Sequence, residues 1–116
     1  MEKYEYFDIS EFDCKETGDN EMQPHFIRWL DIVRALCEFP FVITSGYRSP
    51  KHSKEIVKLT PGQHTKGIAA DIRVSGGAQR YFIVKNALEH GAGGIGVAKD
   101  FVHVDLRSGV GVMWVY

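Results

Sequence analysis

One amphipathic segment, residues 22–37, constrains the fold more than any other part of this sequence. Its apolar residues recur at steps of three and four, the spacing that places side chains on one face of a helix: Met22, Phe26, Leu30, Val33 and Cys37. Pro40 follows shortly afterwards, and a proline stops a helix because it has no amide hydrogen and its ring clashes with the preceding turn. The sequence therefore predicts one long core helix, against which the rest of the chain packs.

The remaining apolar segments are short and have β character. Five of them are predicted as strands because they combine β-branched and aromatic residues and are separated by glycine-containing or polar turns: residues 41–45, 67–74, 95–98, 101–106 and 110–116. We expect the last three to be joined as antiparallel hairpins. In the segment 67–74, alternation places Ile68, Ala70 and Ile72 on one face and Asp71 on the other.

Two further helices are predicted between these strands. Residues 81–88 fit a second amphipathic helix that ends near Gly91, a residue suited to a left-handed helix cap, and residues 53–58 fit a short helix. Strict alternation of strand and helix is missing. The predicted fold class is therefore α+β, a small and mainly antiparallel sheet with two main helices.

Composition limits the kinds of protein this chain can be. At 116 residues, with 44% hydrophobic and 25% charged residues, it fits a single globular domain over residues 1–116, which we expect to be a monomer. With 14 basic and 15 acidic residues there is no broad basic surface, so nucleic acid is not expected as a partner. The sequence has no run of 18 apolar residues and no export signal of the usual kind, so we expect a protein made in the cytoplasm without membrane insertion.

The residues most suggestive of chemistry are His64, Asp71 and His103. His64 precedes the strand at 67–74, Asp71 lies within it, and His103 belongs to a different strand that would have to lie beside it. Two imidazoles and a carboxylate suit one zinc ion and leave its fourth position open for water, as in catalytic zinc sites. From the residues alone the pattern is weak, because a single histidine is more often hydrogen-bonded or exposed than a metal ligand.

Four blocks of sequence together resemble a known family of zinc peptidases. They are Ser-Gly-Tyr-Arg-Ser at 45–49, Gln-His-Thr-Lys-Gly-Ile-Ala-Ala-Asp-Ile at 63–72, Gly-Ile-Gly-Val at 94–97 and Phe-Val-His-Val-Asp-Leu-Arg at 101–107. In order, spacing and identity they are similar to the zinc D-Ala-D-Ala carboxypeptidase and L-alanyl-D-glutamate endopeptidase family, which is related in structure to the hedgehog signalling domain. The likeness extends from about Phe12 to Trp114 and is of the kind seen in small single-domain members from phages and bacteria.

The resemblance implies roles for the residues of a metal site. His64, Asp71 and His103 match the family's ligands for one zinc ion (Zn²⁺), which would activate a water molecule and polarise the scissile carbonyl. Arg48 matches the arginine that contacts the substrate beside the metal, where a planar guanidinium suits a carboxylate or a developing negative charge.

The general base has two candidates. The resemblance implies Asp100, three residues before His103, as the group that takes a proton from water and passes it to the leaving amine. Strand alternation, however, puts Asp105 on the same face as His103 and sends Asp100 the other way unless the chain bends where the strand begins. Asp105 therefore stays open as the base, or as an acceptor that orients an imidazole.

Four other positions carry expectations of their own. His52 and Tyr47 are candidate substrate contacts, although packing beneath the cleft suits the Tyr47 phenol equally well. Trp114 lies in an alternating terminal strand and is expected in the core. The glycines at 93, 94 and 96 lack the setting of a phosphate-binding loop, so we expect them to allow tight turns and close approach of strands.

The resemblance predicts a zinc peptidase that cuts the stem peptides of bacterial peptidoglycan, either at D-Ala-D-Ala or at the L-Ala-D-Glu junction. A small chain without an export signal favours a phage lysis or virion-associated enzyme that acts on the cell wall. The alternative from a different class is a non-catalytic module of the same fold, which would bind wall peptides or a protein and use zinc structurally. A metal-dependent hydrolase of some unrelated small amide is a second alternative.

Overall fold

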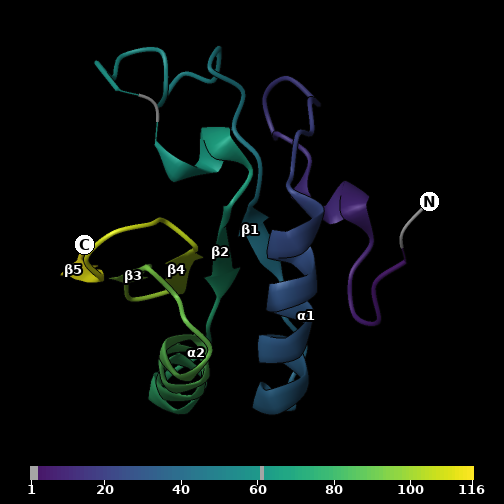
Figure 1. Ribbon diagram of the computed structural model, residues 1–116, viewed down its shortest axis with the longest axis vertical. Coiled ribbons are helices and arrows are strands. Elements are labelled where there is room, and N and C mark those ends of the chain that lie inside the picture. Colours follow the sequence, from purple (N-terminus) through teal and green to yellow (C-terminus); the bar gives the residue numbers. More distant parts are fainter. Residues whose placement is uncertain (1–2, 61) are drawn as a thin grey trace.

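The computed structural model describes residues 3–60 and 62–116, and within them two α-helices pack on one five-stranded sheet (Figure 1). In chain order the elements are the 3-10 helix η1 (Ile9–Phe12), α1 (Pro24–Cys37), β1 (Ile43–Ser45), the 3-10 helix η2 (Gln63–Lys66), β2 (Ala69–Arg73), α2 (Gly77–Glu89), β3 (Gly94–Val97), β4 (Phe101–Asp105) and β5 (Val112–Val115). The strand order is β1-β2-β4-β3-β5, and every neighbouring pair is antiparallel except β3 and β5. The predicted α+β class, with two main helices and a mainly antiparallel sheet, is confirmed.

The two central strands, β2 and β4, give the sheet two different faces. Ala70 and Ile72 in β2 lie opposite Val104 and Val102 in β4, and all four side chains are buried in the core with residues of both helices. Successive side chains of a strand point to opposite faces. The residues between these four therefore face away from the helices, and they form the site described below.

Helix α1 supplies much of the core. It begins at Pro24, which is tolerated in the first turn because an amide there has no acceptor within the helix. It ends before Glu38, whose backbone has left-handed torsion angles. Its buried residues are Phe26, Ile27, Leu30, Val33 and Cys37. The long core helix predicted from periodicity is confirmed, with Met22 buried just ahead of the helix.

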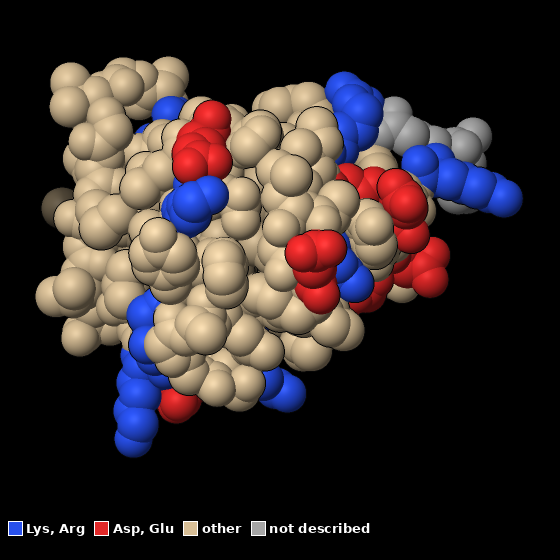
Figure 2. Space-filling view, turned by 90° about the horizontal axis from the view of Figure 1, so that it is seen from below, with Lys and Arg blue, Asp and Glu red and all other residues tan. Residues whose placement is uncertain are grey.

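Helix α2 buries a narrower stripe than predicted. Ile83 and Ala87 are buried where α2 packs against α1 and β4, but Tyr81 and Leu88, which the sequence placed on the same apolar face, are exposed. Figure 2 views the molecule from below, the side on which α1 ends and α2 lies in Figure 1, and residues other than Lys, Arg, Asp and Glu cover most of this face. Within the described residues, neither helix has the length and apolar character that crossing a membrane requires.

The last strand corrects the predicted hairpins. Strands β3 and β4 form one hairpin as expected, but β5 does not pair with β4. Both edges of β4 are already occupied, by β2 and by β3, so β5 adds to the free edge of β3. The chain reverses direction between β4 and β5, which makes β5 parallel to β3. This placement brings the C-terminal residues beside the polar face of the sheet.

Residues 50–60, called here the 50–60 loop, consist of turns and bends, so the short helix predicted within them is wrong (Figure 1, the teal loop at the top). Its backbone hydrogen bonds form single turns that do not continue into a helix: the amides of Glu55 and Ile56 both donate to the carbonyl oxygen of His52, and the amide of Lys58 donates to that of Glu55. Two side chains add local bonds, since the amide of Lys54 donates to His52 Nδ1 at 3.0 Å and the amide of Gly62 donates to Glu55 Oε1 at 3.0 Å. The loop is therefore held by isolated turns and by particular side chains, without a regular backbone ladder.

Candidate metal centre

Three buried residues predicted as metal ligands meet on the polar face of the sheet. Asp71 in β2 and His103 in β4 are direct partners in the antiparallel ladder, so the backbone register alone brings them together. His64 comes from η2, and Gly67 turns the chain from η2 into β2 with a φ of +74°. A Cβ at Gly67 would lie 2.3 Å from the carbonyl oxygen of Glu21, so this sharp turn requires glycine.

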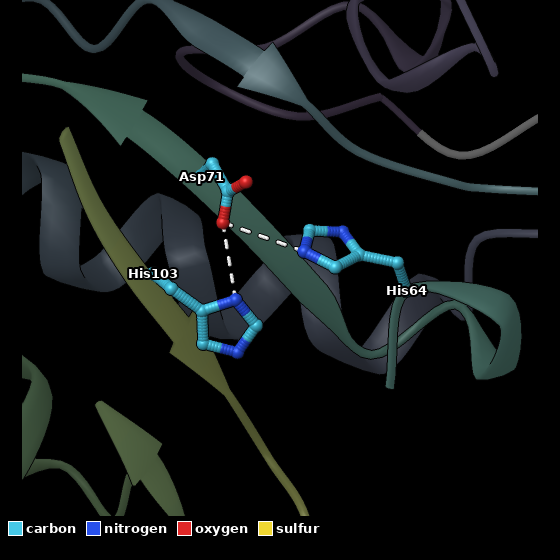
Figure 3. Close-up of side chains that lie close together, drawn as sticks. All are labelled: His64, Asp71 and His103. Carbon is cyan, nitrogen blue, oxygen red and sulfur yellow. Dashed lines mark hydrogen bonds and ion pairs between the residues drawn. The ribbon is translucent and has the colours of Figure 1, made fainter. Parts of the chain in front are cut away.

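The nitrogen and oxygen atoms of these residues converge on a small volume (Figure 3). Asp71 Oδ1 lies 3.0 Å from His103 Nδ1 and 3.4 Å from His64 Nε2. The three possible ligand atoms lie within 4.8 Å of one another. Two imidazole nitrogens and one carboxylate oxygen form the donor set of a catalytic zinc site.

Each histidine has its other ring nitrogen tied to an acceptor. His64 Nδ1 lies 2.7 Å from the carbonyl oxygen of Gly46, which can only accept, so His64 donates there and Nε2 faces Asp71. His103 Nε2 lies 2.7 Å from Asp105 Oδ2, which orients His103 Nδ1 toward Asp71. A hydrogen bond from the second nitrogen to a carbonyl or carboxylate is the usual arrangement of metal-binding histidines. The residues present therefore fit a zinc ion.

Electrostatics at Asp71 and His103 also favour positive charge at this position. Burial alone would raise the pKa of Asp71, but the hydrogen bonds and charges of His103 and His64 hold it well below its usual range. Burial would lower the pKa of His103, but hydrogen bonds to Asp105 and Asp71 outweigh burial and raise it. The carboxylate of Asp71 thus stays ionised in a buried position, where positive charge is needed for balance.

Asp105 is the orienting residue of His103. Its side chain is fully buried and accepts hydrogen bonds from His103 Nε2 and from the backbone amide, Nε and Nη2 of Arg107. Asp105 and Arg107 thus lie at the Nε2 side of the His103 imidazole, whereas Asp71 lies at the Nδ1 side. Of the two roles that the sequence left open for Asp105, this geometry matches the acceptor that orients an imidazole.

Asp100 lies in a bend between β3 and β4 and is exposed. Because the chain bends there, strand alternation does not fix the direction of its side chain. Its backbone carbonyl accepts a hydrogen bond from the amide of Val74 at 2.9 Å. Its side chain makes no hydrogen bond or ion pair with any residue in the described part of the chain, and it does not line the cleft. The adjacent residue, Phe101, does line the cleft.

A cleft of about 680 Å³ opens over the three candidate ligands. Arg48 lines it and places Nη2 3.5 Å from Asp71 Oδ2. His52 also lines the cleft, where Nε2 lies 3.2 Å from Glu16 Oε2. Tyr47 does not: it is buried and its hydroxyl donates to Glu21 at 2.9 Å, outside the cleft. Of the three predicted substrate contacts, the structure thus brings Arg48 and His52 to the cleft but not Tyr47.

Trp114 belongs to the cleft and not to the core, which corrects the sequence prediction. Its ring centroid lies 5.0 Å from that of His103, and the guanidinium of Arg107 lies 5.0 Å from the Trp114 ring. The indole lies over Gly96 of β3, where an added Cβ would be 2.6 Å from Trp114 Nε1. The expected close approach at the β3 glycines is confirmed. Trp114 was misplaced because its strand was predicted to pair with β4 instead of β3.

Glu55 is a residue of the site that sequence analysis missed. Its buried carboxylate lies behind Arg48, with Oε2 3.3 Å from Arg48 Nη1 and 2.8 Å from Lys58 Nζ. Nothing in the sequence distinguishes it from an ordinary acidic residue of a polar loop. Only the fold shows that it is buried against the arginine of the cleft.

Comparison with protein families identifies the family to which this site belongs. Residues 3–105 match a family model described as Peptidase M15, a range that includes the three candidate ligands, Arg48 and Asp100. No curated protein matches the chain.

Proposed function

We propose, from the premise that the chain belongs to the peptidase M15 family, that it is a zinc peptidase that hydrolyses peptide bonds in the stem peptides of bacterial peptidoglycan. Membership confirms the resemblance drawn from the four sequence blocks and makes the chain a member of a metallopeptidase family. The observation that carries the zinc proposal is the buried set of His64, Asp71 and His103, with the second nitrogen of each histidine already occupied.

The three residues would hold zinc through His64 Nε2, His103 Nδ1 and the carboxylate of Asp71. When bound, zinc lowers the pKa of a coordinated water and polarises the carbonyl that is attacked. Asp105 would keep the His103 ring in the required orientation by accepting a hydrogen bond from its protonated nitrogen, Nε2. The Gly46 carbonyl would do the same for His64.

Arg48 would hold the substrate. Its guanidinium lines the cleft beside Asp71 and has N–H groups to spare for a carboxylate or for the oxygen of the scissile carbonyl. The cleft is also lined by Lys15, Lys54 and Lys58, whereas Glu16 is the only carboxylate lining it besides Asp71 among the described residues. A cleft with this excess of cationic groups suits an anionic peptide such as a peptidoglycan stem peptide.

Asp100 is the proposed general base. It would accept the proton of the attacking water and return it to the leaving amine, with its side chain turned over Phe101 toward the cleft. The rival base, Asp105, has its oxygens occupied by His103 and Arg107, which supports assigning the proton transfer to Asp100.

The finer biological role is also part of the proposal. We propose a monomer that is made in the cytoplasm and acts on the cell wall during phage lysis or as part of a virion, and that cuts either D-Ala-D-Ala or L-Ala-D-Glu. A non-catalytic module with the same cleft is the alternative. It would bind wall peptides with zinc present and release no fragment.

Digestion of purified peptidoglycan with the zinc-loaded protein tests the proposal. Mass spectrometry of the soluble fragments is expected to show new amino termini at one type of peptide bond, and the bond cut identifies the activity. A chelator should abolish release, and added zinc should restore it. If the zinc-loaded protein binds stem peptides but releases nothing, the enzyme proposal is wrong and the binding module is favoured.

A further inference from the structure

Arg48, the residue proposed to hold substrate, is itself held by a buried carboxylate. We infer that Glu55 is a positioning residue, which fixes the direction of the Arg48 guanidinium and thereby sets the affinity of the cleft for substrate carboxylates. The inference depends on the proposed function for the role of Arg48, but it makes a separate prediction about how Glu55 and Arg48 act together.

Three anchors define the position of Arg48. Its Nε donates to Ser45 Oγ at 3.2 Å, its Nη1 lies 3.3 Å from Glu55 Oε2, and its Nη2 lies 3.5 Å from Asp71 Oδ2. Ser45 and Asp71 lie beside each other in the β1–β2 ladder and are therefore fixed by the sheet. Glu55 is the one anchor that comes from the 50–60 loop.

Glu55 is placed to act on Arg48 and not on the substrate. Its side chain is 1% exposed, and it does not line the cleft. Besides Arg48 it accepts hydrogen bonds from Lys58 Nζ and from the amide of Gly62. Burial would raise its pKa, but hydrogen bonds from Lys58, Gly62 and Arg48 lower the pKa to about 2. The Glu55 carboxylate is therefore ionised in the folded protein at neutral pH.

The charge of Glu55 matters because Arg48 has a competing partner. Asp71 is also anionic, and without Glu55 the guanidinium would be drawn toward it and away from the substrate. Held between the two carboxylates, Arg48 donates two of its five N–H groups, to Ser45 and Glu55, and its Nη2 forms an ion pair with Asp71. N–H groups of the terminal nitrogens are left for a substrate oxygen. A guanidinium fixed in advance loses less entropy on binding than a free one.

A double-mutant cycle on stem-peptide binding tests the inference. Isothermal titration calorimetry would measure the Kd of a synthetic stem peptide with free carboxylates for the zinc-loaded wild type, Glu55→Gln, Arg48→Met and the double variant. We expect Glu55→Gln to weaken binding about tenfold, as for loss of one charge-assisted hydrogen bond. Arg48→Met should weaken binding further, and adding Glu55→Gln to it should change nothing more.

Kinetics separate positioning from general damage. In Glu55→Gln, KM for the same peptide should rise about tenfold while kcat stays within about twofold and the zinc content is unchanged. Glu89→Gln, which removes a carboxylate from the surface pair with Lys85, is the matched control and should leave both constants unchanged. If Glu55→Gln fails to fold, Glu55→Asp keeps the charge one methylene shorter and should show a smaller rise in KM.

Several results would overturn the inference. Additive losses in the two single variants would show that Glu55 acts independently of Arg48, and a crystal structure of Glu55→Gln with Arg48 unmoved would exclude positioning directly. Absence of hydrolysis by wild type, with the binding cycle still coupled, would reject the proposed enzyme but not the Glu55 role. Absence of peptide binding by wild type would reject the role of Glu55 as stated.

Discussion

The cleft has two walls that are built in different ways. On the sheet side, Asp71 and His103 are fixed by the β2–β4 ladder, and their orientation depends on hydrogen bonds that repeat along the strands. On the other side, the 50–60 loop has no ladder. Within it the Glu55 side chain contacts Lys58, and it joins the loop to Arg48 and Gly62. The loop also exposes the apolar residues Ile56, Val57 and Leu59.

This difference indicates that the two walls have different functions. The backbone ladder positions the groups that would hold zinc, where small displacements are costly for chemistry. The loop supplies cationic groups that would attract the substrate, and these groups need less exact placement than metal ligands do. Substitutions in the sheet wall should therefore abolish metal binding or turnover, and substitutions in the loop wall should mainly change substrate affinity.

Removing a metal ligand should have the largest effect. His103→Ala deletes one of the three candidate ligands, so we expect bound zinc and peptidase activity to fall to background. Among the described residues it leaves the Asp105 side chain with Arg107 as its remaining partner. Metal content by inductively coupled plasma mass spectrometry and fragment release by mass spectrometry are the measurements. An active His103→Ala variant that retained one zinc per chain would refute the assignment of the sheet wall.

Exchanging the two candidate carboxylates should separate chemistry from metal binding. Asp100→Asn is expected to lower kcat by roughly 10²–10⁴-fold with zinc retained, because a general base is lost. Asp105→Asn is expected to weaken zinc affinity by about 10–100-fold, because His103 loses its orienting acceptor, and excess zinc should recover much of the activity. The opposite pattern, with zinc retained and kcat lost in Asp105→Asn, would make Asp105 the base.

Much of the sheet wall could be predicted from the sequence. Alternation in residues 67–74 placed Asp71 away from the Ile72 side, and the resemblance identified His64 and His103; these inferences need only local pattern and a known family. The position of Trp114 could not be predicted in the same way. It depends on which sheet edge was free for β5, a property of the whole topology.

The loop wall was predicted least well, for a physical reason. Glu55 is buried because a cation on each side and a backbone amide compensate its charge, and no periodicity in the sequence records such an arrangement. The helix predicted over 53–58 is replaced by single turns, in which the amides of Glu55 and Ile56 share the carbonyl oxygen of His52. Tyr47 was left open between two roles, and its hydrogen bond to Glu21 accounts for its position outside the cleft.

Gly96 of β3 allows a test of the sheet wall at a position other than the three candidate metal ligands. Gly96→Ala would place a Cβ 2.6 Å from Trp114 Nε1, so the indole must move from His103, and we expect about 1–3 kcal/mol of destabilisation with reduced activity. Thermal unfolding and peptide hydrolysis measure the two effects. Gly111→Ala is the matched control, since the nearest atom to an added Cβ is 3.8 Å away. Equal effects of both substitutions would mean that Trp114 does not matter at this position.

Lowering the pH should remove the stability that the ionised Glu55 side chain of the loop wall contributes to the folded protein. A carboxyl whose pKa is lower in the folded state stabilises the protein above its unfolded pKa, and this contribution is lost as pH falls through the folded value, here about 2. Wild type should therefore be more stable than Glu55→Gln by roughly 1–3 kcal/mol at pH 6, and the difference should shrink between about pH 4.5 and pH 2. Urea unfolding of both metal-free proteins across this range is the measurement. A difference that does not change with pH would show that the Glu55 charge contributes no stability.

Salt should have the smallest effect and should act on the loop wall alone. Lys54 of the loop wall lines the cleft and forms no ion pair within the described residues, so its attraction for an anionic peptide is exposed to screening. We expect KM for a stem peptide to rise by about two- to threefold between 20 mM and 200 mM sodium chloride, with kcat unchanged. Lys54→Met should flatten this dependence, whereas Lys85→Met, on the outer surface of α2, should not. A fall in kcat with salt would instead mean that the screened charge acts on turnover. The loop wall would then not be limited to substrate affinity, and the two walls would not differ in function.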